Sequence, residues 1–486
     1  MNVARVVIVG GGLAGMSAAE SLSTIHPETQ ITILESKRVL GGRAGSYDDP
    51  QFDSTVDYCQ HVAMGCCTNL IDLLTRCGLD QHFRRYRELC FLHPDHSPSR
   101  FAPNRLLPAP LHLVGTINAL RYLSRTQKRQ VKRGLWRLMR TPASSIVDVR
   151  ASDWLRQARQ DDQTIRDFWD VILVSALGEQ TNQVSMAAAR KVLIDGFAIA
   201  HGASDVMVPT LPLANLFGRM LADVLMQRGV RILVGHGVRQ IRSDASVVTS
   251  ENRFESDYVI SAVPWYQTAR LFDQWCEDER RRLPCFDAFA AFPTSPISGL
   301  HLWFDSEITD LDHAVMVGTT AQWLFRDPCN RRVRSGPSTA SSQTVQSHYY
   351  QVVISASADV KSKPEAQLVE TVLAELRRAF PLARQTRLLR HRMVTDPKSV
   401  FSILPEVETI RPAAETEVPW LVLAGDWTKT DWPATMEGAV ISGRLAAKAI
   451  SRHIRRNAQK QPFPDESFVC PGLPPGRLAR WMIRHG

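Results

Sequence analysis

The most regular pattern of apolar and polar positions lies at the start of the chain, in residues 4–36, ARVVIVGGGLAGMSAAESLSTIHPETQITILES. A short β-branched run comes first, followed by a glycine-rich turn, a helix-like stretch and a second β-branched run. Short apolar runs bounded by glycine favour buried strands, and the segment between them is long enough for one helix. The pattern therefore predicts a β-α-β unit.

Two later segments carry comparable signals. Residues 227–265, QRGVRILVGHGVRQIRSDASVVTSENRFESDYVISAVPW, alternate short β-branched runs with turn residues, which predicts an antiparallel meander whose last run returns to the core sheet. Residues 421–443, LVLAGDWTKTDWPATMEGAVISG, form a strand-like apolar run that ends at Asp426 and is followed by a helix of small residues from about Met436. Strand-forming segments are thus spread over most of the chain.

Length and composition favour a globular protein of two or three domains. The chain has 486 residues, of which 44% are hydrophobic. The net charge of +9 suits nucleic acid, and it equally suits the anionic surface of a membrane. Charge alone does not choose between these partners.

The sequence shows no targeting segment and no metal site. No stretch approaches the roughly 18 apolar residues that cross a bilayer, and the N-terminal apolar run is short and rich in glycine. The nine cysteines form no CxxC pair and no metal-ligand spacing. We therefore expect a cytoplasmic protein without a metal centre.

The glycines of the first turn have the spacing of a dinucleotide-binding loop. Gly10, Gly12 and Gly15 match GxGxxG between a strand and a helix. They allow the tight turn, the close approach of a pyrophosphate and the packing of the helix on the strand. Glu35 ends the second strand, where a carboxylate can accept hydrogen bonds from the ribose hydroxyls. In this context the motif predicts a bound dinucleotide.

A second glycine segment follows directly, in SKRVLGGRAGSYDD. Gly41 and Gly42 let the chain pass close to the same dinucleotide, and Arg43 offers a guanidinium to a phosphate or to the far end of the cofactor. NAD enzymes do not usually carry this extension, so it favours FAD.

Together, the N-terminal glycine loop, LGGRAGS and LAGDWTKTDWPATMEGAVISGRLAA resemble the flavin amine oxidase and phytoene desaturase superfamily. The resemblance implies that the C-terminal segment returns to the FAD domain, with Gly425 and Asp426 at the ribityl or pyrophosphate region. It also implies that Val238 lies against the adenine and that the helix from Met436 points its N-terminus at the flavin. The positive end of a helix dipole would stabilise negative charge there.

A narrower resemblance rests on four further segments, VDYCQHVAMGCCTNLIDLLTRCG, VMVPTLPLANLFG, GLHLWFD and QWLFRD. They are similar to the squalene-associated branch, the hydroxysqualene dehydroxylases that make squalene for hopanoid synthesis. The similarity runs from about residue 4 to about residue 450. Tyr58 and Cys59 depart from it, because they replace a small, polar pair in a loop that should pass the isoalloxazine.

The resemblance implies an α/β fold in which a Rossmann-like FAD domain is interleaved with a substrate domain of helices and antiparallel sheet. The FAD domain comprises residues 1–90, 205–285 and 395–456, and the substrate domain residues 91–204 and 286–394. Residues 457–486 are expected to form a proline-rich basic tail that packs loosely over residues 461–477.

The implied reaction needs a proton donor, because hydroxide is a poor leaving group. His61, next to Gln60 in the loop expected to face the flavin and its binding site, is the first candidate, and a structural histidine is an equal alternative. Asp57 is a weaker candidate that would also suit a loop-organising acceptor. Trp432 and His301 are expected in the substrate pocket.

Three functions remain open from the sequence. The first is reductive dehydroxylation of hydroxysqualene, a long-chain isoprenoid. The second is oxidation by a carotenoid-type desaturase or an amine oxidase, although amine oxidases commonly place a lysine where GLHLWFD offers His301. The third is a non-catalytic flavin-binding partner at the membrane. With a single GxGxxG motif, the electron donor is not identified.

The basic residues are concentrated in residues 121–140, RYLSRTQKRQVKRGLWRLMR, and in the tail RLARWMIRH. Both segments interleave cations with aromatic and aliphatic residues, which suits the interface of an anionic membrane. A solvated helical face explains the same pattern nearly as well. A triterpene substrate stored in membrane favours peripheral membrane association, whereas nucleic acid has no recognition motif here.

Overall fold

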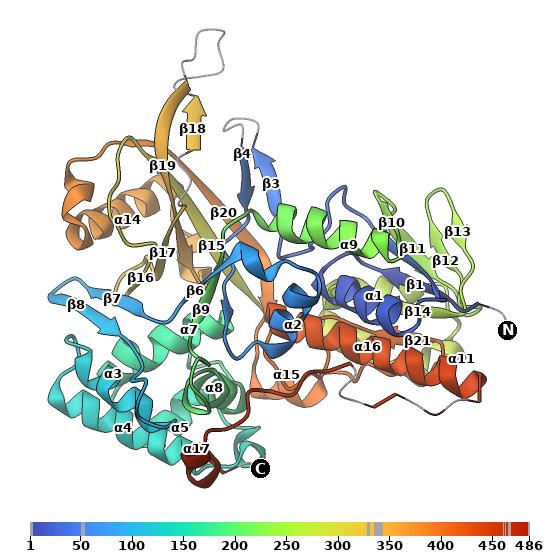
Figure 1. Cartoon of the computed structure of the whole chain (residues 1–486), viewed down its shortest axis with the longest axis horizontal. Coiled ribbons are helices and arrows are strands. Elements are labelled where there is room, and N and C mark those ends of the chain that lie inside the picture. Colours follow the sequence, from blue (N-terminus) through green and yellow to red (C-terminus); the bar gives the residue numbers. More distant parts are fainter. Residues whose placement is uncertain are drawn as a thin grey trace.

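A five-stranded parallel sheet forms the centre of one half of the molecule (Figure 1). The computed structural model describes residues 3–49, 54–327, 331–334, 344–459, 461, 463–464 and 468–484. The strand order is β10 (Arg231–Val234), β2 (Gln30–Glu35), β1 (Arg5–Val9), β14 (Tyr258–Ser261) and β21 (Leu421–Leu423), and all neighbours are parallel. The predicted β-α-β unit is confirmed, and the sheet takes strands from three distant parts of the chain.

The first and the last long helices of this half pack against each other. Helix α1 (Leu13–Ile25) lies beside α16 (Met436–Asn457) under the parallel sheet (Figure 1). A Cβ atom on Gly443 would lie 2.1 Å from the carbonyl oxygen of Ala14, so the approach of the two helices requires glycine there. The C-terminal segment therefore returns to the N-terminal unit, as the resemblance implied.

The predicted meander of residues 227–265 is confirmed only in its middle. Strands β11 (Val238–Ile241), β12 (Val247–Thr249) and β13 (Arg253–Phe254) form an antiparallel sheet. The last run, β14, returns to the parallel core sheet as expected, but the first run, β10, belongs to that sheet as well and not to a meander. Short apolar runs do not reveal their partners, because pairing is decided by distant segments.

The other half of the molecule contains an eight-stranded sheet. Its order is β20 (Leu388–Phe401), β15 (Thr294–Phe304), β19 (Thr344–Ile354), β17 (Trp323–Arg326), β16 (His313–Met316), β7 (Leu89–His93) and β8 (His96–Phe101), with β18 (Arg331–Arg334) paired to β19. All pairs are antiparallel except β7 with β16. Strand β20 continues through the domain boundary expected at residue 395.

Helices cover this second sheet on one side and form a lobe beneath it (Figure 1). Leu368, Val372 and Leu376 of α14 (Glu365–Ala379) pack against Leu300 and Val352 of the sheet. The helical lobe contains η2 (Leu111–Leu113), α3 (Val114–Ala119), α4 (Arg125–Met139), η3 (Ala143–Ile146), α5 (Ala151–Gln157), α6 (Asp162–Thr164), η4 (Ile165–Asp170), α7 (Val171–Leu177), α8 (Met186–Leu193) and η5 (Ile194–Ala198).

Shorter elements connect the two halves. Two small sheets pair β3 (Ser46–Asp49) with β4 (Ser54–Asp57), and β9 (Val206–Pro209) with β5 (Ala63–Met64) and β6 (Phe83–Tyr86). The remaining helices are α2 (Thr68–Arg76), η1 (Asp80–His82), η6 (Ala214–Leu221), α9 (Ala222–Gln227), α10 (Trp265–Thr268), η7 (Ala269–Phe272), α11 (Glu277–Arg280), α12 (Phe286–Ala290), α13 (Ala358–Lys361), η8 (Pro381–Arg384), α15 (Pro405–Ile410) and α17 (Arg477–Met482).

The described part of the tail is packed, not loose. Phe468, Ala479 and Ile483 are buried, and the Arg484 N–H donates to the carbonyl of Met139 over 2.8 Å. Within the segment expected to pack loosely, that expectation was wrong at Phe468, because its apolar side chain packs into the core. Residues 460, 462, 465–467 and 485–486 lie outside the described residues. Among the helices that the structure describes, none is both long enough and apolar enough to span a bilayer.

Candidate active site

A cavity of about 400 Å³ lies at the carboxyl ends of the parallel strands. Most residues that the sequence assigns to the cofactor line it together with His61: Gly10, Gly12, Glu35, Gly41, Gly42, Arg43, Gln60, Val238, Gly425, Asp426 and Met436. The ends of parallel strands are where open α/β sheets bind ligands. The structure thus brings these distant residues to one site.

The first glycine loop leaves room for a ligand against its backbone. Gly10 has φ +113°, and a Cβ atom there would lie 2.7 Å from the carbonyl oxygen of Ala262. At Gly12 the nearest neighbour of a Cβ atom would be the Gly42 Cα at 3.8 Å. Gly12 directly precedes α1 and has no side chain that could cap the helix. The first N–H groups of α1 therefore remain available for a phosphate.

Gly15 does not line the cavity but fixes the position of α1. A Cβ atom at this position would lie 2.0 Å from the carbonyl oxygen of Gly10 and 3.2 Å from the side chain of Ile8. This is the role of the third glycine in the motif, the close packing of helix on strand.

Glu35 is held at the end of β2 by backbone donors. Its Oε2 accepts the Gly11 N–H over 2.8 Å, and its Oε1 accepts the Lys37 N–H over 2.8 Å. A carboxylate oxygen can accept more than one hydrogen bond, so the fixed group can also accept from ribose hydroxyls. The second glycine segment lies directly alongside, because the Gly41 N–H donates to the Gly11 carbonyl over 2.9 Å.

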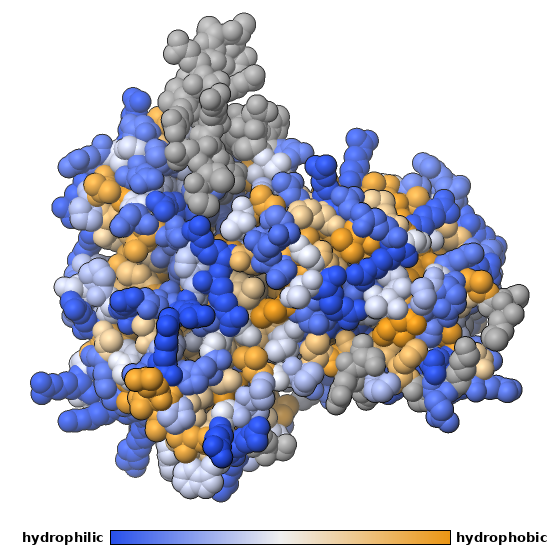
Figure 2. Space-filling model, viewed as in Figure 1, coloured by the Kyte–Doolittle hydropathy of each residue, from blue (hydrophilic) through white to orange (hydrophobic). Residues whose placement is uncertain are grey.

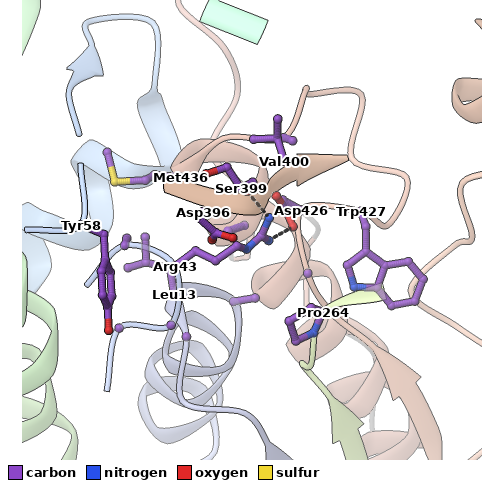
Figure 3. Close-up of a pocket in the computed structure, with 18 of the residues that line it drawn as sticks. Leu13, Arg43, Tyr58, Pro264, Asp396, Ser399, Val400, Asp426, Trp427 and Met436 are labelled. Carbon is purple, nitrogen blue, oxygen red and sulfur yellow. Dashed lines mark hydrogen bonds and ion pairs between the residues drawn. The ribbon is translucent and has the colours of Figure 1, made fainter. Parts of the chain in front are cut away.

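Arg43 and Asp426 form a buried ion pair within the cavity wall (Figure 3). The Arg43 guanidinium also donates to the Ser399 carbonyl over 3.0 Å and lies 5.2 Å from the centroid of the Trp265 ring. Burial opposes the charge of Arg43, but the attraction of Asp426 and its hydrogen bond outweigh that effect and raise the Arg43 pKa. Arg43 therefore remains charged, and its guanidinium is largely committed to protein partners.

The N-terminus of α16 completes the wall. Thr435 caps the helix by accepting the Gly438 N–H over 3.1 Å, and both Thr435 and Met436 line the cavity. The Gly425 N–H donates to the Ser442 hydroxyl over 2.8 Å, which ties the end of β21 to the same helix. The positive end of the α16 dipole is thus placed at the cavity, where it favours negative charge.

The loop that contains His61 also lines this cavity. The His61 Nδ1 lies 2.8 Å from the Cys59 carbonyl oxygen, which can only accept, so Nδ1 carries the proton. Burial lowers the His61 pKa and leaves the ring neutral near pH 7. His61 Nε2 forms no hydrogen bond with any residue that the structure describes. In this tautomer it is an acceptor, so a proton donor at Nε2 requires the disfavoured imidazolium.

Tyr58 and Cys59, the two residues that depart from the squalene-associated branch, belong to the same loop. The Tyr58 ring stacks on Tyr47 with centroids 5.5 Å apart. Burial, and secondly the charge of Asp57, raises the Cys59 pKa to about 12, so its thiol stays protonated.

Three other predicted residues lie outside the lining of the cavity. The Asp57 Oδ1 accepts the Ser46 hydroxyl over 2.5 Å and the Leu213 N–H over 2.9 Å, which favours the loop-organising role. His301 is fully buried with its Nδ1 2.7 Å from the Tyr349 hydroxyl, and Trp432 packs under the Lys191 ammonium at 5.1 Å. His301 and Trp432 line neither this cavity nor the smaller one described next, contrary to the sequence interpretation.

A second cavity of about 200 Å³ shares Gln60 with the first. Its lining includes Asp57 and Gln60 at and after the end of β4, residues 208–212 at and after the end of β9, and residues 325–327 at the end of β17. This second cavity is hereafter called the Gln60 cavity.

Sequence reasoning missed Tyr266, Trp427 and Asp396, which also line the larger cavity. Burial raises the Tyr266 pKa, so its hydroxyl keeps its proton. Tyr266 follows β14, and a position just after a parallel strand is a signal that could have identified it. Asp396 lies beside Arg43 (Figure 3) but belongs to the long strand β20, which carries no such signal.

Residues 13–451 match the family described as flavin containing amine oxidoreductase. The chain belongs to this family. The cavity of this chain has a glycine cradle, a helix N-terminus and a fixed carboxylate. These features fit FAD, the cofactor of a flavin-containing family. FAD is therefore the cofactor, with the first glycine loop, Glu35 and the α16 N-terminus positioned to hold it.

Curated relatives are similar to this chain over nearly its whole length. It is 23% identical over 471 residues to a 15-cis-phytoene desaturase of Solanum lycopersicum, covering 92% of this chain and 77% of the relative. It is 24% identical over 472 residues to 15-cis-phytoene desaturase of Synechococcus elongatus, covering 92% and 95%. It is 22% identical over 487 residues to zeta-carotene desaturase of a Synechocystis strain, covering 92% and 97%.

Solved structures share the fold of this chain. Putrescine oxidase bound to putrescine superposes with a TM-score of 0.65 at 15% identity, covering 92% of this chain and 99% of the oxidase. Cyclohexylamine oxidase from Brevibacterium oxydans superposes with a TM-score of 0.64 at 15% identity, covering 94% of this chain and 100% of that oxidase. The expected combination of an FAD-binding α/β unit with a mixed helical and sheet unit is confirmed.

Proposed function

We propose that this FAD-dependent oxidoreductase reductively converts hydroxysqualene to squalene. The observation that carries the proposal is the Gln60 cavity. Parts of three of the four segments that resemble the squalene-associated branch, residues 56–78, 206–218 and 322–327, come from separate parts of the sequence and meet on its wall. Gln60 joins this cavity to the FAD cavity. A resemblance that converges in space on one cavity beside the cofactor supports a shared substrate.

In the proposed reaction an allylic alcohol is reduced to a hydrocarbon. The allylic C–O bond breaks, a C–H bond forms at the same carbon, and the hydroxyl leaves as water. When bound and reduced, FAD supplies the hydride. The protein must place the allylic carbon at the cavity, exclude bulk water and deliver one proton to the leaving oxygen.

Two side chains can hold that proton at the FAD cavity. His61 is the donor inferred from the sequence, but its hydrogen bond to Cys59 and its lowered pKa leave a neutral ring with an acceptor at Nε2. The Tyr266 hydroxyl keeps its proton because burial raises its pKa. We therefore propose Tyr266 as a second candidate acid, with the neutral His61 accepting a hydrogen bond from the substrate hydroxyl.

The second candidate function is carotenoid-type desaturation. The similarity to phytoene and zeta-carotene desaturases favours it, and so does the free acceptor at His61 Nε2, because a desaturase removes a hydride and a proton from its substrate. The two functions use the same cavity with electrons flowing in opposite directions.

The test is product analysis by mass spectrometry in deuterated water. Reduced enzyme with hydroxysqualene is expected to give squalene with one deuterium on the former carbinol carbon, because the transferable hydrogen of reduced flavin exchanges with solvent. Oxidised enzyme with phytoene is the matched reaction in the other direction. A conjugated polyene from phytoene, with hydroxysqualene unchanged, would establish desaturation. Absence of turnover on both substrates would leave the oxidation of amines or a non-catalytic flavin-binding role.

A further inference from the structure

We infer that the helical lobe carries a surface that docks on an anionic lipid bilayer. This docking surface consists of the loop 104–111, the exposed face of α4 and the helix α17. Two contacts bring the three segments together. Gly476, which precedes α17, lies next to Ala109, and the Arg484 N–H donates to the carbonyl of Met139 at the end of α4. The inference concerns where the enzyme works and does not depend on which reaction it catalyses.

The apolar part of the docking surface is exposed to an unusual degree. Leu106 is 93% exposed, Trp481 is 76% exposed and Trp136 is 57% exposed, and Leu107 and Leu111 are also exposed. Leu106, Trp481 and Trp136 are the three most exposed large apolar side chains of the described residues. Figure 2 shows apolar groups beside strongly hydrophilic ones over this lobe, at the lower left of the view. Exposed apolar groups that gather in one region mark an interaction site.

The charged part is a row of arginines along α4. Arg125, Arg129 and Arg133 follow one another at intervals of four residues, so they lie on the same face of the helix. No ion pair joins any of them to the residues that the structure describes. Like charges at this spacing destabilise a helix, and a helix that keeps them is suited to an anionic partner outside the chain.

The acidic residues near α4 are already engaged. Asp167 accepts from Gln127 over 2.7 Å, and Asp161 accepts from Gln130 over 2.8 Å and caps α6 at Thr164. On the other side of α4, Lys128 and Lys132 donate to Asn118 of α3. The arginine row therefore faces outward while the polar groups on its flanks hold the helix in place.

The combination identifies the partner as a lipid surface. Phosphate headgroups complement the arginine row, and aromatic and aliphatic side chains such as Trp481 and Leu106 favour the interface below the headgroups. A nucleic acid would use the arginines but gain little from the apolar side chains. The same lobe also reaches the FAD cavity, because Ser175, Ala176 and Leu177 of α7 line that cavity.

The experiment is sedimentation of the full-length holoenzyme with vesicles. Vesicles of equimolar phosphatidylglycerol and phosphatidylcholine are compared with vesicles of phosphatidylcholine alone. We expect binding to the anionic vesicles that weakens as salt is raised. The triple variant Arg125→Gln, Arg129→Gln, Arg133→Gln should bind about a hundredfold more weakly at low salt, since each basic residue near an anionic surface contributes about a factor of five.

A matched triple variant removes the same charge elsewhere. Arg239→Gln, Arg242→Gln and Arg377→Gln change exposed residues of β11, the turn after it and α14, and they should bind like the unchanged protein. The pair Leu106→Ser and Trp481→Ser keeps every charge and should lose the part of the binding that resists salt. Both side chains are exposed, so the fold should be preserved.

Three outcomes would overturn the inference: no binding of the unchanged protein to anionic vesicles, equal losses in the two triple variants, or unchanged binding in the Leu106 and Trp481 pair. Duplex DNA serves as a competitor. Displacement of vesicles by DNA, together with no effect of the apolar pair, would assign the arginine row to nucleic acid.

Discussion

Arg43 and Asp426 are 383 residues apart in the chain and form an ion pair in the wall of the FAD cavity. One residue follows the second glycine segment, and the other follows the last strand of the parallel sheet. The pair therefore joins the two ends of the cofactor-binding unit within the lining of the cavity.

The Asp426→Ala variant should lose both stability and flavin. Asp426 is 4% exposed, so its removal leaves Arg43 with an unpaired charge. We expect a loss of roughly 3 kcal/mol in the free energy of unfolding, at the lower end for a buried pair because Arg43 keeps some solvent contact. The ratio of flavin to protein absorbance after purification measures occupancy, and Asp153→Ala, which removes an exposed carboxylate, is the control. Full flavin occupancy in Asp426→Ala would show that the pair does not organise the site.

Two glycine-to-alanine variants should have opposite effects. In Gly443→Ala the new methyl group would lie 2.1 Å from the Ala14 carbonyl oxygen, so α16 must move away from α1. In Gly115→Ala the methyl group meets no atom within 4 Å. Thermal unfolding should show a large decrease in the free energy of unfolding for Gly443→Ala. For Gly115→Ala that free energy should rise by about 0.4–1 kcal/mol, because alanine reduces the conformational freedom of the unfolded chain. Equal midpoints would contradict the close packing of the two helices.

His112 should make the protein sensitive to acid. Burial, and secondly the charge of His201, lowers the His112 pKa to about 4. The unfolded chain binds the proton more readily, so the contribution to stability is present above about pH 6.5 and is lost as the pH falls towards 4. The difference amounts to about 2–3 kcal/mol. Denaturant unfolding measures the free energy of unfolding between pH 7 and pH 4. This free energy should fall less for His112→Phe than for the unchanged protein, and an identical fall in the two proteins would contradict the prediction.

Tyr266→Phe and His61→Gln separate the two candidate proton donors. If Tyr266 supplies the proton, Tyr266→Phe should lower the rate of the chemical step by roughly a hundredfold or more while flavin remains bound. His61→Gln keeps a hydrogen-bond acceptor and should have a smaller effect. The acidic limb of the rate profile should lie below pH 6.5, because the His61 pKa is lowered and the neutral ring is the working form. The reverse order of effects would assign the acid to His61.

The fold could be predicted where local sequence decides it. The glycine loop and Glu35 have fixed offsets from strands, so their place at the cofactor site could be predicted from spacing, whereas the place of Asp426 was implied by the family resemblance. The partners of β10 and the extension of β20 past residue 395 could not be predicted, since strand pairing depends on segments more than a hundred residues away.

The sequence predicted the position of the site better than the protonation and orientation of its side chains. The tautomer of His61 is set by the Cys59 carbonyl, a contact that appears only when the loop is folded. His301 lies on the expected strand but its side chain is buried against Tyr349, because alternate residues of a strand face opposite sides and the register was not known. Tyr266 carries no motif, and its position after β14 became informative only once that strand was known to belong to the parallel sheet.

The most direct measurement is an anaerobic single turnover of the FAD-bound enzyme. The flavin is first reduced, hydroxysqualene is added, the flavin absorbance is followed and the lipid product is identified. The proposed function predicts that the oxidised flavin spectrum returns as squalene forms in equal amount. A flavin that stays reduced with hydroxysqualene, while oxidised enzyme is bleached by phytoene, would contradict the proposed reaction and leave the fold and the cofactor as described.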